Sequence, residues 1–166
     1  SSSTQTYNDA VTVNGTLDLT GSTVQFASTL QGDGTTDVIT ISGNLDLDGA
    51  ASLLTSLTVE GTSNLGANVT TSGTQQYDGA VTLSADVILT TTDNDATFGS
   101  TIDSDSTARD LTLTLGSGSA SVTGIVGTTA LDVLTLNSSS SFTAAVTASS
   151  IVNAASKTAT FSDAVT

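Results

Sequence analysis

The sequence predicts an all-β fold, a parallel β-helix (β-solenoid) of about six to eight rungs, and three observations favour it. Short segments alternate apolar and polar residues with a period of two, as strands with one buried side do. Segments of the chain resemble one another, as in arrays whose units stack on their neighbours. The 166 residues include no Pro and only six aromatic side chains, which suits a narrow core one rung thick.

Short segments along the whole chain have the apolar-polar-apolar pattern of a strand whose middle residue faces solvent. Clusters of Gly, Ser, Asn and Asp separate these segments and supply turns. The absence of Pro fits this arrangement, because Pro inside a ladder removes a hydrogen-bond donor. In order, the predicted strands are residues 11–13, 17–19, 24–26, 39–41, 45–47, 57–59, 81–83, 111–115 and 134–136.

The segment from Thr74 to Leu83 is repeated elsewhere in the chain. Thr4 to Val13 is identical to it at six of ten positions. A shorter form, aromatic-x-x-Ala-Val-Thr, recurs from Phe142 to Thr147 and from Phe161 to Thr166. Repetition of this kind indicates stacked structural units rather than one central core.

Longer matches define the repeat length. Phe26 to Leu30 resembles Phe98 to Ile102, and this pair is separated by nearly the same interval as the two copies of the leading motif. The sequence therefore predicts one continuous solenoid segment over 1–166, with supra-repeats at roughly 4–73 and 74–166.

Threonine occupies the middle of six predicted strands, at recurring but uneven intervals along the chain. Each interval fits the circumference of one coil with loops of variable length. The six residues would then form one outward column on one sheet, the kind of surface that binds ice. The high β propensity of Thr explains the same pattern without a ligand. The residues are Thr12, Thr40, Thr58, Thr82, Thr112 and Thr135.

The alternative fold is a tandem pair of antiparallel β-sandwiches. The scarcity of aromatic residues and the uneven strand spacing favour the solenoid. In the solenoid, Phe26, Phe98, Phe142 and Phe161 would fill the wider corners of the coil.

The charge balance limits the classes of partner. The chain has 16 acidic and two basic residues, a net charge of −14. Nucleic acids and anionic membranes both require clustered Lys or Arg, so neither is an expected partner. No apolar run approaches the roughly 20 residues of a membrane span, so no membrane insertion is expected. The absence of Cys excludes a disulfide scaffold.

Catalysis is not expected. Without His or Cys, a general base or nucleophile would have to be a carboxylate, a hydroxyl or Lys157. A polysaccharide-active β-helix remains the enzymatic alternative, because Asp46 and Asp48 lie at i and i+2 on one strand. Sugar-binding enzymes also use aromatic platforms, and Tyr7 and Tyr77 are the only tyrosines.

Alternate acidic residues occur in two turns that flank Phe98. Calcium takes six to eight oxygen ligands, and alternate Asp side chains in a turn can supply them with backbone carbonyls. The sequence therefore predicts a candidate calcium site, with solvated turn carboxylates as the alternative. Asp33 and Asp37 occupy the corresponding turn of the first supra-repeat. No other cofactor is expected. The candidate ligands are Asp93, Asp95, Asp103 and Asp105.

The Tyr-Asp/Asn-x-Ala-Val-Thr units, together with Leu-Asp-Leu-x-Gly and Phe-x-Ser-Thr-Leu/Ile segments, carry a family resemblance over nearly the whole chain. They resemble the filamentous-haemagglutinin-like repeat regions of giant bacterial surface and secreted adhesins. The resemblance implies a right-handed parallel β-helix stalk, export to the cell exterior, and a role in adhesion, matrix building or filament formation.

The expected function is therefore a structural or adhesive extracellular segment of a repetitive bacterial surface protein. It would act as a rigid stalk or as a fibre-forming unit. The expected partners are neighbouring repeats of the same chain, further copies joined end to end, and surface glycans. A calcium-stabilised adhesin or matrix module is the main alternative.

Overall fold

The computed structural model describes residues 3–166, which form a parallel β-helix of about eight coils without a helical segment. Every strand pairing in this range is parallel, and each strand lies against its equivalent in the next coil. The coils differ in length: a short one leads from Leu45 to its partner Ser63, and a longer one leads from Ile102 to Val126. The predicted solenoid is confirmed, and the antiparallel sandwiches are excluded.

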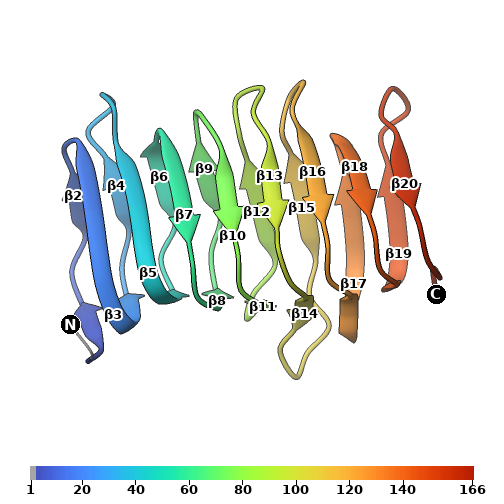
Figure 1. The fold of residues 1–166 in the computed structure, drawn as a ribbon, viewed down its shortest axis with the longest axis horizontal. Coiled ribbons are helices and arrows are strands. Elements are labelled where there is room, and N and C mark those ends of the chain that lie inside the picture. The colour runs from blue at the N-terminus through green and yellow to red at the C-terminus, as the bar shows by residue number, and fades with distance from the viewer. Residues whose placement is uncertain (1–2) are drawn as a thin grey trace.

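Each coil contributes strands to three faces (Figure 1). Face 1 contains β1 (Gln5–Tyr7), β8 (Ser63–Leu65), β11 (Val81–Leu83) and β14 (Ile102–Ser104). Face 2 contains β2 (Val11–Val13), β4 (Leu30–Gly32), β6 (Ala51–Leu54), β9 (Val69–Thr71), β12 (Val87–Thr90) and β15 (Leu111–Thr114). Face 3 contains β7 (Ser56–Val59), β10 (Gln75–Tyr77), β13 (Ala96–Phe98), β16 (Ser119–Val122), β18 (Ser139–Phe142) and β20 (Ala159–Phe161).

Four longer strands continue around a corner of the coil. β3 (Thr16–Phe26) and β5 (Val38–Leu47) run from face 3 into face 1. β17 (Val126–Leu136) and β19 (Val146–Asn153) run from face 1 into face 2. Their pairings show register shifts where the chain turns.

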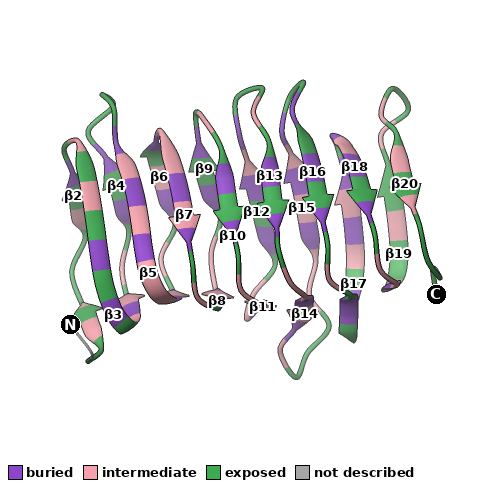
Figure 2. Cartoon of the chain, in the orientation of Figure 1, coloured by how far each residue is buried: buried purple, intermediate pink, exposed green. Residues whose placement is uncertain are grey.

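The core is a set of stacked columns, one inward residue from each coil. Along a strand the inward residues are buried and their neighbours are more exposed, as Figure 2 shows. The pairing register places aliphatic and aromatic side chains in one long column of face 3, with Tyr77 and Phe98 at its middle. Its members are Leu19, Ile41, Val59, Tyr77, Phe98, Val122, Phe142 and Phe161.

Aromatic rings stack between neighbouring coils. Tyr7 lies on Phe26 with ring centroids 5.1 Å apart, and Tyr77 lies on Phe98 at 5.3 Å. Both pairs are nearly parallel, with interplanar angles of 12° and 10°. These aromatic pairs add to the burial energy of the column, since stacked rings attract one another beyond their buried area.

The two copies of the leading motif lie on different faces. Tyr7 is in β1 on face 1, whereas Tyr77 is in β10 on face 3. The stacked partners, Phe26 and Phe98, are displaced in the same way. The separation between the two copies is therefore not a whole number of coils. The motif repeats a local strand-turn-strand unit, and that unit fits more than one side of the coil.

The predicted single column of threonines is wrong. Thr82 is on face 1, and Thr12 lies on face 2 far from its predicted neighbours. Only the pairs Thr40 and Thr58 on face 3, and Thr112 and Thr135 on face 2, are adjacent across coils. The prediction failed because it counted one such strand per coil, whereas each coil contributes three.

We expect Phe98→Ala to lower the free energy of unfolding by about 3–5 kcal/mol, because Phe98 is 1% exposed and its removal leaves a cavity beside Tyr77. The matched control is Thr97→Ala, at the exposed position before it, with an expected change within about 0.5 kcal/mol. Urea unfolding followed by circular dichroism measures both. Equal losses in the two variants would contradict the assigned inward and outward faces.

Candidate functional site

The turns between faces carry a recurring kind of polar contact between coils. At these corners, Asp and Asn side-chain oxygens accept backbone N–H bonds from a neighbouring coil, at 2.7–3.1 Å. We call these contacts inter-coil caps. They pair donors at places where the ladder turns, and unpaired buried donors are costly. In residues 3–166 the capping residues are Asp37, Asn44, Asn68, Asp86, Asp93, Asp95, Asp103 and Asp110.

Two of the predicted calcium ligands are caps at the corner between faces 2 and 3. Asp93 has a left-handed backbone (φ 58°), and its Oδ1 accepts the N–H of Ser117 at 2.7 Å. Asp95 Oδ1 accepts the N–H of Ser119 at 2.8 Å and the hydroxyl of the same residue at 3.1 Å. Each carboxylate therefore joins its own coil to the next one.

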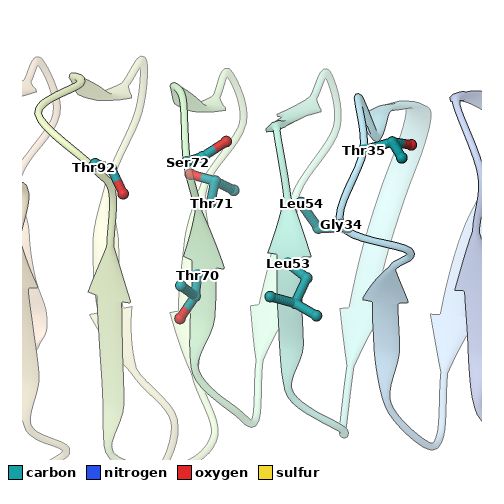
Figure 3. A pocket seen from close by; sticks show the side chains of 8 residues that line it. All are labelled: Gly34, Thr35, Leu53, Leu54, Thr70, Thr71, Ser72 and Thr92. Atoms are coloured by element: carbon teal, nitrogen blue, oxygen red, sulfur yellow. The ribbon is translucent and has the colours of Figure 1, made fainter.

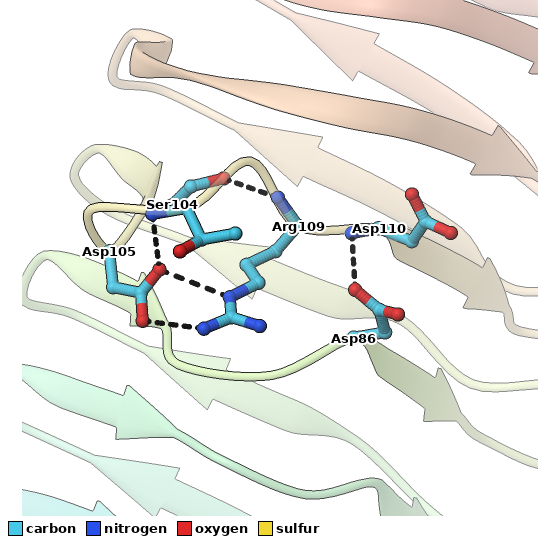
Figure 4. A network of polar contacts seen from close by, with 6 residues as sticks. Asp86, Ser104, Asp105, Arg109 and Asp110 are labelled. Carbon is cyan, nitrogen blue, oxygen red and sulfur yellow. Dashed lines mark hydrogen bonds and ion pairs between the residues drawn. The ribbon is translucent and has the colours of Figure 1, made fainter.

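The other two predicted ligands lie at the corner between faces 1 and 2. Asp103 in β14 accepts the N–H of Thr129 at 3.0 Å. Asp105 forms a two-point ion pair with Arg109, at 3.0 Å to Nε and 2.8 Å to Nη2, and accepts the N–H of Thr107 (Figure 4). The Arg109 hydrogen bonds lower the pKa of Asp105, and the pKa of Arg109 is raised in return.

The structure thus places the four predicted ligands at two different corners. Asp93 and Asp95 precede β13, whereas Asp103 and Asp105 lie within and after β14. Within residues 3–166, no group of three His, Cys, Asp or Glu side chains is arranged to hold a metal ion. Calcium at Asp93, Asp95, Asp103 and Asp105 stays a prediction.

The acidic pair considered for sugar hydrolysis is also bonded between coils. Asp46 accepts the amide of Asn64 at 2.8 Å, and Asp48 accepts the amide of Gln25 at 3.1 Å. A shallow polar depression surrounds Asp46, Asn64 and Thr82 on face 1. Its lining in the described chain contains no aromatic side chain on which a sugar ring would stack.

A buried polar pair escaped the sequence analysis. The Tyr77 hydroxyl donates to Gln75 Oε1 at 3.2 Å, and Gln75 Nε2 donates to the carbonyl of Thr90 at 2.9 Å. Tyr7 and Gln5 form the same bond at 3.2 Å. The sequence feature that could have predicted this pair is the Gln-x-Tyr spacing shared by the two motif copies. Burial raises the pKa of Tyr77, so the hydroxyl remains a donor to Gln75.

The burial of Asp37 is the second feature that the sequence did not indicate, although the sequence places this residue in a turn that corresponds to the candidate calcium turns. Asp37 lies immediately before β5 and is completely buried. Its Oδ1 caps the N–H of Gly15 at 2.9 Å, whereas its Oδ2 has no hydrogen-bond partner among the described residues. The sequence marks it only as one turn aspartate among several, because its burial depends on the coils on either side.

An open depression of about 240 Å³ lies on the outside of face 2, beside this corner (Figure 3). Its lining comes from four successive coils, from the loop at Gly34 and Thr35 past Leu53 and Thr70 to Thr92. Leu53 is 56% exposed and has a left-handed backbone (φ 56°), a conformation that is costly for a leucine.

Comparison with protein-family models, with curated proteins and with solved structures found no match. In the described part of the chain, no helix is long and apolar enough to cross a membrane.

We expect the solenoid to lose stability as the pH falls below about 4 towards 2. Hydrogen bonds from Thr35 to Asp33, and from Arg109 and Thr107 to Asp105, hold both folded pKa values below the ordinary 3.8. Their contribution is therefore complete above 3.8 and is lost as the pH falls through the folded pKa values. The urea midpoint at several pH values measures the effect.

Asp105→Asn is the control for this titration, because it removes one of the two shifted carboxyls. Its urea midpoint should depend less steeply on pH than that of the unaltered chain. A midpoint that stays constant down to about pH 2 in the unaltered chain would contradict the assignment.

Proposed function

We propose that this chain is a rigid structural segment of a long repetitive bacterial surface protein, acting as a stalk or a fibre-forming unit. The observation that carries the proposal is the unbroken parallel ladder through about eight coils, with a continuous stacked core. A ladder of this kind transmits force along its axis through many hydrogen bonds in parallel. Its length grows by a fixed step for each added coil.

The composition of the surface supports a spacer in an aqueous environment. The net charge of −14 disfavours collapse and nonspecific association between neighbouring molecules. The extracellular bacterial location rests on the resemblance of the repeats to those of large adhesins. Under this proposal the chain itself has no catalytic role.

The same ladder defines the partners that fit it. A coil presents its strand edges along the axis, and another coil of equivalent register can pair with them. The partner is then a neighbouring repeat of the same chain in a stalk, or a second copy in a fibre. Hydroxyl and amide side chains along the faces, such as Thr97 and Gln76, are suited to hydrogen bonding with surface glycans.

A narrow distance distribution between spin labels tests the rigid stalk. The chain has no Cys, so Thr12→Cys and Asn137→Cys would place two labels at exposed positions of face 2. Thr12 and Asn137 are six coil steps apart on face 2, past residues 31, 52, 70, 90 and 114, and these steps correspond to about 29 Å between backbones.

Double electron–electron resonance should show one narrow peak near this distance, widened only by the label arms. The same labelled chain in concentrated urea is the control and should give a broad distribution. A broad distribution in native buffer would contradict a rigid segment.

A further inference from the structure

Asp37 differs from every other inter-coil cap in its environment. It is 0% exposed, whereas the other capping side chains are exposed or half-buried. One of its oxygens receives the Gly15 N–H, and the other is buried without a hydrogen-bond donor among the described residues. Burying a carboxylate with an unsatisfied oxygen is unfavourable unless that oxygen is protonated or pairs with a cation.

No side chain of the protein supplies the missing positive charge. The sequence has two basic residues. Arg109 is paired with Asp105, and Lys157 Nζ donates to the carbonyl of Gly116. The nearby hydroxyl of Thr55 is also in use, since it accepts the N–H of Asp37 at 3.0 Å and donates to the carbonyl of Thr35 at 3.4 Å.

Oxygen atoms from two further residues lie at the same corner as Asp37. Asp33 lies earlier in the same turn, where its carboxylate accepts the N–H and the hydroxyl of Thr35 and the amide of Asn14. The carbonyl oxygen of Leu53, one coil further on, packs against Gly32 on the same side as Asp37 Oδ2. A Cβ atom at Gly32 would collide with both oxygens, so a glycine is required for them to approach.

We propose that the corner formed by Asp33, Asp37 and Leu53 is a calcium site. The two carboxylates and the Leu53 carbonyl oxygen supply the protein ligands, and water completes the six to eight oxygens that calcium takes. The open depression lined by Gly34, Thr35 and Leu53 lies beside this corner (Figure 3). Calcium suits this irregular set of oxygens better than magnesium, which requires near-octahedral geometry.

Calcium bound here would join three successive coils. Asp37 already bonds to Gly15 in the preceding coil, Asp33 belongs to the same turn, and Leu53 comes from the following coil. The left-handed backbone at Leu53 brings its carbonyl to this corner while its side chain faces solvent. The proposal goes beyond the stalk function and does not depend on it.

Isothermal titration of the chelator-stripped chain with CaCl₂, at physiological ionic strength, tests the site. We expect one site with a dissociation constant on the order of 10⁻⁴ to 10⁻³ M, as for calcium sites with few protein carboxylates, and weaker binding of MgCl₂. Calcium should also raise the thermal midpoint, since it binds only the folded chain.

Asp37→Asn keeps an oxygen for the Gly15 N–H and should weaken calcium binding at least about tenfold, because it removes a charged ligand. Asp33→Asn should have the same effect. Because Asp33 is exposed, its substitution is not expected to disturb folding, so the result does not depend on the buried Asp37 variant alone. Asp86→Asn is the matched control, since Asp86 caps the N–H of Asp110 at another corner and is not one of the predicted calcium ligands, and it should bind calcium like the unaltered chain.

Two results would overturn the proposal. If no cation binds beside the buried Oδ2 of Asp37, titration of the unaltered chain will show no discrete calcium site. If calcium only screens the acidic surface, binding will be diffuse, will disappear at moderate salt and will be reduced equally by Asp37→Asn and Asp86→Asn.

Discussion

Hydrogen bonding from coil to coil is the interaction on which the rest of the structure depends. Each strand pairs with its equivalents on both sides, so the buried backbone is satisfied only when the coils stay in register. The corners lack this regular pairing, because there the chain leaves strand geometry and the hydrogen-bond ladder is interrupted. Asp and Asn side chains repair these interruptions by accepting N–H groups from the neighbouring coil, as Asp95 does for Ser119. The thin core can then remain aliphatic, with a few aromatic stacks.

The acidic composition has a structural explanation in this arrangement. Carboxylates are acceptors only, and a corner offers unpaired donors, so Asp is well suited to capping. Asp86, Asp93 and Asp103 all serve in this way and remain in contact with solvent. Asp37 is an exception among these capping residues, because one of its oxygens is buried and unpaired among the described residues. The same chemistry that closes the corners therefore leaves one corner at which we propose that a cation pairs with the buried carboxylate.

Much of the fold could be predicted from local sequence. The alternation in segments such as 39–41 and 57–59 reports directly which side chains face the core, because period two is a property of a single strand. The placement of strands on faces could not be predicted, since coil length varies with the loops. Tyr7 and Tyr77 share a motif and still lie on different faces, and the six threonines were assigned to one column for the same reason. The burial of Asp37 depends on Gly32 and Leu53, which no local pattern connects to it.

Amide hydrogen exchange measured by NMR tests the coil-to-coil account most directly. The N–H groups of Ser117, Ser119 and Thr129 lie in or beside turns, where free amides exchange quickly, and the structure pairs each with an aspartate of another coil. The account predicts that these three amides are protected to a degree comparable with strand amides such as that of Thr82. Exchange of the three at the rates of an unstructured peptide, with Thr82 still protected, would contradict the claim that side chains close the ladder at its corners.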